Sequence, residues 1–197
     1  MKIFDQIKDR IFDVPLVFDL VRWSVLGSYK PMRNNLKKFV GLKLSESVLE
    51  VGCGTGIFSN LFGENYFGID FFENFIKIAR KKNPKVKFEV MDALNMHIDD
   101  KFDKVLLLNF LHHLNDKQVE ELLSVIFKYC KGSVIIMEPV PQKYNLIGRF
   151  LYSMDRGKFI RKSIDLKTIV SNNAEISKEL VFQSFLYKLI LLEIRPK

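Results

Sequence analysis

Short apolar segments alternate with helix-like segments through the middle of this 197-residue chain. Strands are predicted at residues 47–51, 66–70, 87–92, 102–110 and 133–138. Residues 105–108 and 134–137 are apolar at every position, so both faces of those strands should be buried. Strands of this kind form parallel sheets that helices cover on both faces. The sequence therefore predicts an α/β fold with a doubly wound sheet.

Apolar residues recur at helical spacing between the strands. Helices are predicted at residues 31–41, 56–63, 72–83 and 116–129, and residues 1–30 also have a helical pattern. Asn115 with Gln118 resembles a capping box at the start of the helix at 116–129. The final quarter departs from the alternation, because residues 180–194 hold two apolar runs with no room for a crossover helix. That last pair of strands should be antiparallel.

The length and composition predict one soluble globular domain over residues 1–197. Hydrophobic residues make up 48% of the chain and charged residues 27%, which excludes a disordered chain and a disulfide scaffold. The net charge of +8 leaves a polyanion, an acidic membrane or an anionic substrate open as a partner. Cys53 and Cys130 have no metal-like spacing and suit a reducing compartment. Because no secretory signal opens the sequence, we expect a cytoplasmic protein.

Gly52, Gly54 and Gly56 follow the strand at 47–51 and precede a predicted helix. Glycines at such a turn let the backbone approach a ligand closely, and a helix N-terminus favours negative charge. The dinucleotide fingerprint would need glycine where Ile57 stands, and the Gly-Lys-Ser/Thr of nucleotide hydrolases is missing. The loop therefore indicates a nucleoside-like ligand whose acidic group need not be a pyrophosphate.

Two carboxylates end the next two predicted strands. Asp70 ends the strand at 66–70, where a doubly wound sheet can bind both ribose hydroxyls of a nucleoside. Asp92 ends the strand at 87–92 and can accept a hydrogen bond from an exocyclic amine. The carboxyl ends of parallel strands form the ligand-binding edge of open sheets, so both acids and the glycine loop should lie together.

The series of motifs resembles the class I S-adenosylmethionine-dependent methyltransferase family, in its small-molecule branch. The residues that carry the resemblance are Val48–Gly56, Gly68–Asp70, Met91–Ala93, Phe102–Val105 and Leu111–Leu114, in this order and spacing. The likeness is strong over residues 46–139 and looser over the C-terminal strand pair. It implies a Rossmann-like seven-stranded sheet of order 3-2-1-4-5-7-6 with strand seven antiparallel, and a helical N-terminal cap.

The resemblance also implies S-adenosylmethionine as the cofactor and S-adenosylhomocysteine as its product. Glu50 would lie near the ammonium group of the cofactor, Asp70 would hold the ribose, and Asp92 would meet the adenine amine. Phe71 and Ala93 would lie beside the adenine, and Asn109 near the reacting methyl. The implied cofactor-binding set is Glu50, Gly52, Cys53, Gly54, Asp70, Phe71, Asp92, Ala93 and Asn109.

Methyl transfer from a sulfonium is an in-line displacement, so alignment of the acceptor and exclusion of water can supply most of the rate. Several substrate classes lose support. Residues 109–112 read Asn-Phe-Leu-His rather than the Asn/Asp-Pro-Pro-aromatic of enzymes that methylate nucleic-acid amines. The sequence also lacks a Pro-Cys pair and an acidic cluster with metal-ligand spacing. We therefore expect a small-molecule acceptor at oxygen, nitrogen or carbon, with no metal and no nucleic acid as partner.

His112 and His113 are the candidates for a general base, because the intrinsic pKa of histidine suits proton transfer near neutrality. Adjacent residues of a strand point to opposite faces, so at most one of them should face the site. The alternative is that these side chains only pack or form structural hydrogen bonds.

Substrate recognition should come from outside the cofactor-binding core at 46–139. The N-terminal cap at 1–45 would bring Tyr29 or Arg33 to the ligand. The connection at 140–165 mixes aromatic and basic residues, and Arg156 and Arg161 are the arginines expected to bind a substrate anion. The alternative is a helix with solvated cations. Residues 166–197 would form the last helix and the C-terminal strand pair.

Two other functions stay open. Residues 1–30 could lie on a membrane surface, as in a lipid or quinone methyltransferase. The chain could also bind the cofactor without catalysis and act through a partner protein. The sequence does not specify an oligomeric state.

Overall fold

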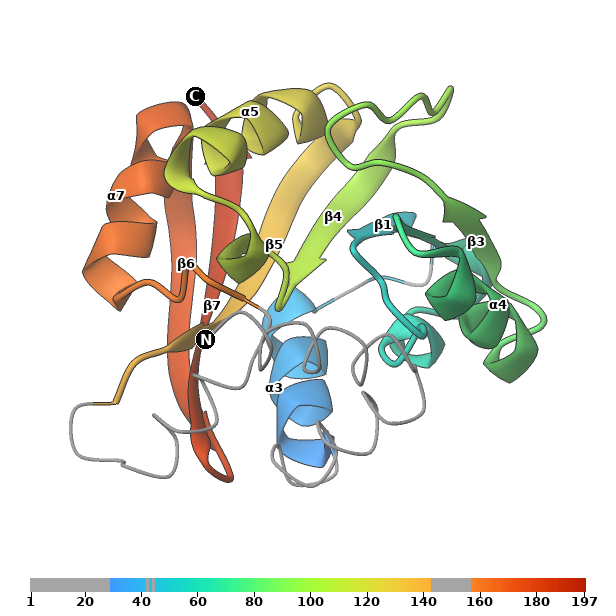
Figure 1. Cartoon of the computed structure of the whole chain (residues 1–197), viewed down its shortest axis with the longest axis horizontal. Coiled ribbons are helices and arrows are strands. Elements are labelled where there is room, and N and C mark those ends of the chain that lie inside the picture. The colour runs from blue at the N-terminus through green and yellow to red at the C-terminus, as the bar shows by residue number, and fades with distance from the viewer. Residues whose placement is uncertain (1–28, 42, 44, 143–156) are drawn as a thin grey trace, which may run out of the picture.

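The computed structural model describes residues 29–41, 43, 45–142 and 157–197. Within these ranges the chain forms a seven-stranded sheet of order β3-β2-β1-β4-β5-β7-β6 (Figure 1). The pairs β1–β2, β1–β4, β2–β3 and β4–β5 are parallel, whereas β7 runs antiparallel to both β5 and β6. The predicted strand order and the antiparallel strand are confirmed.

The strands lie close to their predicted positions. Their bounds are β1 Val48–Val51, β2 Tyr66–Asp70, β3 Lys87–Val90, β4 Phe102–Leu108, β5 Cys130–Val140, β6 Ala174–Ser184 and β7 Tyr187–Pro196. Every residue of β1 and β2 is buried, as expected for central parallel strands. β6 alternates largely exposed with partly buried residues at the edge of the sheet, and its register against β7 shifts between Ile176 and Lys178.

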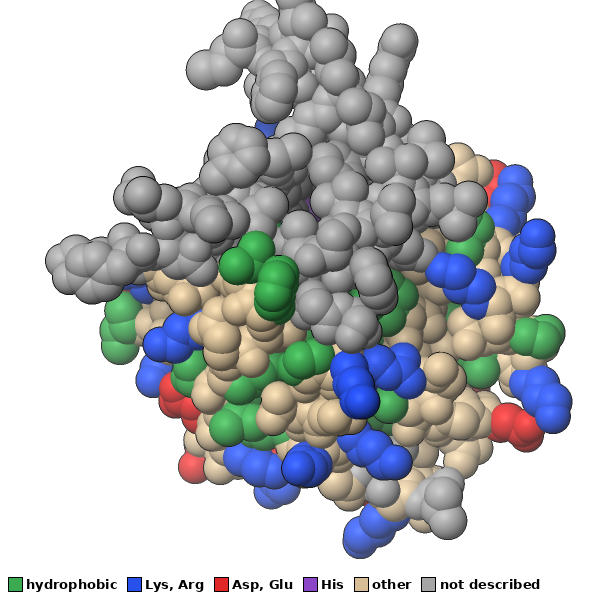
Figure 2. Space-filling model, turned by 90° about the horizontal axis from the view of Figure 1, so that it is seen from below, with side chains coloured by type: hydrophobic (Ala, Val, Ile, Leu, Met, Phe, Trp, Pro, Cys, Tyr) green, Lys and Arg blue, Asp and Glu red, His purple; other side chains and the backbone are tan. Residues whose placement is uncertain are grey.

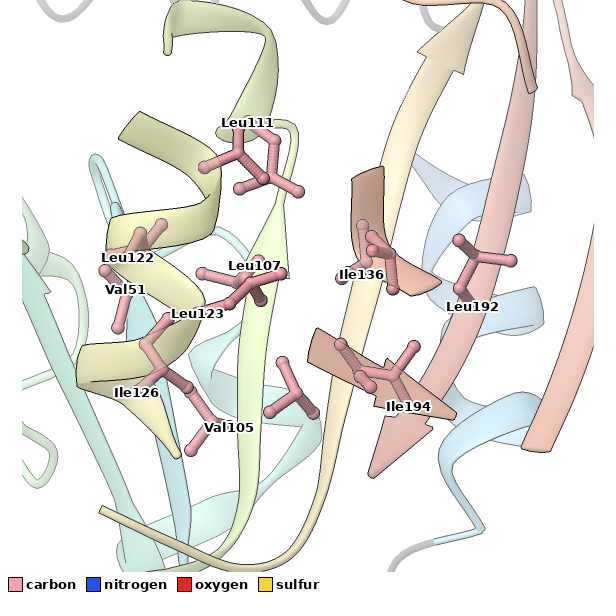
Figure 3. Packing of buried hydrophobic residues seen from close by; sticks show 14 of the residues in the cluster. Val51, Val105, Leu107, Leu111, Leu122, Leu123, Ile126, Ile136, Leu192 and Ile194 are labelled. Carbon is pink, nitrogen blue, oxygen red and sulfur yellow. The ribbon is translucent and has the colours of Figure 1, made fainter. Parts of the chain in front are cut away.

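Helices cover both faces of the sheet (Figure 1). One face packs against α3, Lys30–Val40, and α4, Glu73–Lys82, and the other against α5, Asp116–Ile126, and α7, Ser163–Asn173. In Figure 3 the side chains of Leu122, Leu123 and Ile126 on α5 point toward Val105 and Leu107 of β4. All five side chains are fully buried, so this layer excludes water from the centre of the sheet.

The capping box of α5 is confirmed. Asn115 Oδ1 accepts a hydrogen bond from the Gln118 backbone N–H at 2.9 Å, and Gln118 Oε1 accepts from the Asn115 backbone N–H at 3.0 Å. These bonds satisfy backbone donors that the start of a helix leaves without partners. They also fix where the chain turns into α5 after the residues that follow β4.

The predicted helix at 56–63 is wrong. Residues that follow Gly54 form turns and two short 3-10 helices, at Ser59–Leu61 and Gly63–Asn65. Gly56 and Gly63 have φ angles of 70° and 72°. Left-handed residues at both positions cannot continue a right-handed helix, and the segment between them forms turns and a 3-10 helix instead.

Part of the predicted peripheral organisation lies outside the described residues. Of the N-terminal cap at 1–45, the structure describes mainly α3, and residues 1–28 are not described. Of the connection at 140–165, residues 143–156 are not described. None of the helices in the described ranges combines the length and the apolar character that crossing a membrane requires.

The start of β4 is joined to β1 by a carboxylate. Asp103 Oδ2 accepts hydrogen bonds from the Ser47 backbone N–H at 2.8 Å and from Ser47 Oγ at 2.9 Å. These hydrogen bonds from Ser47 lower the pKa of Asp103 below its ordinary value. The charged form of Asp103 is therefore the form that stabilises the fold.

We expect the stability advantage of the wild type over an Asp103→Asn variant to depend on pH. Because the folded pKa lies below the unfolded value of about 4, the advantage is complete above that pH and disappears as pH falls through the folded pKa. Urea unfolding at pH 6 and at pH 3 measures it, with the exposed Asp99→Asn as the control. An advantage of equal size at both pH values would contradict this role of Asp103.

Candidate functional site

A cavity of about 530 Å³ lies at the carboxyl ends of β1, β2 and β4 and beside the residues that follow β3. Figure 2 looks onto this end of the molecule, where several hydrophobic side chains of the described residues reach the surface. The topology explains the position, because open α/β sheets bind ligands beyond the carboxyl ends of their strands. All nine residues predicted to bind the cofactor line this cavity: Glu50, Gly52, Cys53, Gly54, Asp70, Phe71, Asp92, Ala93 and Asn109.

The glycine loop folds back onto β2. The backbone N–H groups of Gly52 and Cys53 both donate to the Ile69 carbonyl, at 2.8 and 2.9 Å. Gly52 has a φ angle of 73°, and a Cβ there would overlap the ring of Phe110. The position therefore requires glycine for two reasons, a left-handed backbone and close packing.

Asp70 braces the same loop. One carboxylate oxygen accepts from the Gly54 backbone N–H at 2.8 Å and the other from the Phe72 backbone N–H at 2.9 Å. The carboxylate thus connects the glycine loop to the start of α4 while it lines the cavity. A carboxylate has about four acceptor positions, so bracing the loop is compatible with binding ligand hydroxyls.

Glu50 places a second buried carboxylate in the cavity wall. Glu50 Oε2 accepts a hydrogen bond from the Tyr66 hydroxyl at 2.6 Å. Burial, and then the charge of Glu50, raise the pKa of Tyr66 well above its ordinary value, so Tyr66 stays a hydrogen-bond donor. Burial also raises the pKa of Cys53, and the charges of Glu50 and Asp70 add to this effect. Cys53 is therefore a protonated thiol and not a nucleophile.

The residues after β3 form the side of the cavity next to the exposed Phe71. Asp92 accepts from the Leu94 backbone N–H at 3.0 Å and from Asn95 Nδ2 at 2.8 Å, which orders the turn that carries Ala93. The ring of Phe71 is 67% exposed and meets that of Phe72 edge to face, with centroids 5.6 Å apart. An exposed aromatic ring at the rim of a cavity is suited to covering a flat ligand group.

Asn109 stands at the end of β4 in a left-handed conformation, with a φ angle of 54°. Such a backbone is strained for a residue with a side chain and persists only where its surroundings enforce it. Its backbone N–H donates to the Met137 carbonyl at 2.7 Å. Its side-chain Nδ2 is buried and has no hydrogen-bond partner among the described residues. Asn109 therefore offers the cavity a donor that an acceptor group on a ligand could use.

The prediction that the two histidines are adjacent strand residues is wrong. β4 ends at Leu108, and Leu111–His113 is a 3-10 turn. The structure nevertheless separates them. His113 lines the cavity, whereas His112 is buried outside the cavity lining with its Nδ1 2.6 Å from Glu138 Oε2. Of the two candidates for a general base, His113 is the one at the cavity.

Of the two N-terminal residues expected at the ligand, Tyr29 lines the cavity and Arg33 does not. Tyr29 lines the cavity and meets Phe58 edge to face, with ring centroids 6.4 Å apart. Arg33 does not line it: the guanidinium donates to the Ile57 carbonyl at 2.6 Å and to Asn60 Oδ1 at 2.5 Å. Arg33 joins α3 to the segment after the glycine loop, and its contact with a ligand stays a prediction.

Arg161 also forms its hydrogen bonds within the protein. Its guanidinium donates to Asp116 Oδ1 at 2.8 and 2.9 Å, to the Leu111 carbonyl at 2.9 Å and to the Leu114 carbonyl at 2.6 Å. Arg161 is not part of the cavity lining, so this network argues against the expected binding of a substrate anion. Arg156 lies outside the described residues.

Sequence reasoning missed one buried charge beside the cavity. Glu138, near the end of β5, is 3% exposed and receives hydrogen bonds from the turn that follows β4. A carboxylate within the otherwise apolar run at 134–140 was the signal for it. Within the described ranges, no three His, Cys, Asp or Glu side chains gather in a way that could hold a metal ion.

Residues 48–132 match the family model of the methyltransferase domain. Over 79 residues the chain is 34% identical to a protein of Invertebrate iridescent virus 6 named "Putative methyltransferase 235L". That alignment takes in 38% of this chain and 30% of the viral protein, so the chain spans about a third of the length of this curated relative.

Two solved structures with bound S-adenosylhomocysteine (SAH) share the fold. The first is magnesium protoporphyrin IX methyltransferase from Synechocystis PCC 6803, with a TM-score of 0.72 and 18% identity over 90% of this chain and 87% of that one. The second is N-methyltransferase NodS from Bradyrhizobium japonicum WM9, with a TM-score of 0.65 and 17% identity over 83% and 86%. At these identities the comparison shows the fold.

Proposed function

We propose that this chain, which carries a methyltransferase domain of the class I fold, transfers the methyl group of S-adenosylmethionine to a small-molecule acceptor. The observation that carries the proposal is the cavity at the carboxyl ends of β1, β2 and β4. The glycine loop and the two strand-end carboxylates Asp70 and Asp92 converge there, as a nucleoside-like cofactor requires.

The donors and acceptors of the cavity fit this cofactor. The Asp70 carboxylate would accept hydrogen bonds from the ribose hydroxyls, and Phe71 would cover the adenine beside Ala93 and Asp92. At the other end, the Glu50 carboxylate would attract the ammonium group of the methionine part. The buried Nδ2 of Asn109 would donate to its carboxylate and so gain the partner that it lacks among the described residues.

The cofactor supplies a methyl group that the positive sulfur already activates. When the cofactor is bound, the acceptor atom would donate its electron pair to the methyl carbon as the carbon–sulfur bond breaks, which would leave SAH as a neutral thioether. The protein aligns the two reactants and keeps water out of the cavity. Where the acceptor carries a proton, His113 is the cavity-lining side chain that we assign to remove it.

The acceptor class is proposed from the sequence, because the connection at 140–165 is described only in part. We propose a small molecule, since the motifs for methylation of nucleic-acid bases are missing. The free thiols of Cys53 and Cys130 support a reducing compartment, and we place the reaction in the cytoplasm.

The test uses methyl-labelled S-adenosylmethionine with the purified protein and a cell extract of the source organism. After reaction, the extract is separated into lipid, aqueous small-molecule, protein and nucleic-acid fractions. We expect label in the aqueous small-molecule fraction above that of an Asp70→Ala control. Label in protein or nucleic acid would overturn the acceptor class, and label in lipid would favour an enzyme that works at a membrane surface. Cofactor binding without label in any fraction would favour a protein that binds the cofactor but does not catalyse transfer.

A further inference from the structure

Glu138 accepts hydrogen bonds from three consecutive residues. Its Oε1 accepts from the backbone N–H groups of Phe110 and Leu111, each at 2.7 Å. Its Oε2 lies 2.6 Å from His112 Nδ1. The carboxylate and the imidazole are both almost fully buried, with side-chain exposures of 5% and 4%. A buried carboxylate must be compensated in this way, so the three donors and Glu138 depend on one another.

The turn that Glu138 holds connects two residues of the cavity wall. Asn109 lies immediately before it, in its left-handed conformation, and His113 lies at its end. Phe110, whose N–H binds Glu138, also packs against Gly52 of the glycine loop. Glu138 itself does not line the cavity. Its carboxylate can therefore influence a ligand only through the turn that it orders.

The segment at 157–161 holds the same turn from the other side. The Phe159 backbone N–H donates to the His112 carbonyl at 3.0 Å, and Arg161 binds the carbonyls of Leu111 and Leu114. Gly157 packs so closely on the imidazole of His112 that a Cβ there would overlap the ring. The turn is thus enclosed between β5 and the segment that leads into α7.

We propose that Glu138 is a positioning residue for the methyl-transfer end of the cavity, acting through the 110–112 turn and through the ring of His112. The proposal rests on the proposed function, because it assumes that the cavity binds the cofactor. In this role, Glu138 Oε2 accepts the Nδ1 proton of His112 and so selects one tautomer of the ring. The oriented ring and the ordered backbone together hold Asn109 and His113 at the cavity.

Glu138→Gln and Glu138→Ala separate the two parts of this role. In Glu138→Gln, the amide oxygen can still accept from Phe110 and Leu111, while the amide nitrogen must donate to His112 Nδ1. We expect a neutral His112 that carries its proton on Nε2, with the affinity for SAH within about threefold of wild type. In Glu138→Ala the turn loses all three hydrogen bonds, and we expect the affinity to fall about tenfold or more.

Glu193→Ala is the matched control. Glu193 on β7 is also a hydrogen-bonded carboxylate, which accepts from Ser133 Oγ at 2.6 Å and from Lys104 Nζ at 3.1 Å. Unlike Glu138, it forms none of these bonds with the turn that carries Asn109 and His113. This variant should lower stability and leave the affinity for SAH unchanged. Titration calorimetry with SAH gives the affinities, and nitrogen NMR of the histidines gives the tautomer without any ligand.

The outcomes distinguish this proposal from the proposed function. Wild-type affinity for SAH in a folded Glu138→Ala variant would overturn the positioning role, and so would a His112 proton that stays on Nδ1 in Glu138→Gln. A wild-type protein that does not bind SAH would count against the proposed function and against positioning of a cofactor. If Glu138→Ala does not fold, the tautomer of His112 in Glu138→Gln decides the question.

Discussion

Gly52→Ala is expected to reduce the affinity for SAH by about a hundredfold or more, which corresponds to about 2.7 kcal/mol. An alanine at this position would adopt a left-handed backbone at a cost of about 1–2 kcal/mol. Its Cβ would also overlap the ring of Phe110. The main chain that carries this ring is held by the bond from the Phe110 backbone N–H to the buried Glu138. The glycine loop or the ring must therefore move, and both line the cavity.

Gly63→Ala separates the two causes. Gly63 has a φ angle of 72°, almost the same as that of Gly52, but a Cβ there would meet no atom within 4 Å. Gly63 is also outside the cavity lining. We expect this variant to lose about 1–2 kcal/mol of stability and to bind SAH as the wild type does. Equal SAH affinities of the two variants in calorimetry would refute the steric role of Gly52.

Asp70→Ala is expected to weaken SAH binding by a similar factor, about a hundredfold. Removal of the carboxylate takes away the proposed acceptor for the ribose hydroxyls. It also leaves the backbone N–H groups of Gly54 and Phe72 without their partner, at a cost of about 1–3 kcal/mol for each group that stays buried. Asp70→Asn should fall between the wild type and Asp70→Ala, because the amide keeps one oxygen but presents an N–H₂ group to the second donor.

Asp103→Ala is the matched control for Asp70→Ala. Asp103 is another carboxylate that accepts from a backbone N–H, but it lies at the start of β4, away from the carboxyl ends of the strands. Asp103→Ala should destabilise the fold and leave the affinity for SAH unchanged. If both variants lost affinity equally, the effect of Asp70→Ala would be one of stability and the ribose role would be wrong.

The sheet was predictable because its signals are local. Residues 105–108 and 134–137 are apolar at every position, and that pattern can be read without knowing what the strands contact. The C-terminal hairpin followed from length, since a chain of two residues between β6 and β7 leaves no room for a crossover. The glycine loop and Asp70 were predictable in the same way, by their positions at strand ends.

The support around the cavity was not predictable, because it depends on contacts between distant segments. Glu138 and Phe110 are separated by 28 residues, and Arg161 and Leu111 by 50. An arginine in a basic, aromatic segment has the same sequence signal whether it binds an anion or the carbonyls of a turn. The helix predicted after Gly56 failed for another reason, because Gly56 and Gly63 both adopt a left-handed backbone that interrupts a right-handed helix.

The register shift of β6 against β7, between Ile176 and Lys178, lies in a strand that matters for solubility. β6 is the outer strand of the sheet, and outer strands with unpaired backbone groups can recruit strands from other molecules into aggregates. Lys178 stands next to this register shift, and its Nζ donates to the Phe39 carbonyl of α3 at 2.7 Å and lies 4.4 Å from the centre of the Phe39 ring. The same lysine thus anchors α3 to the sheet and places a charged side chain on the border that would otherwise add a foreign strand.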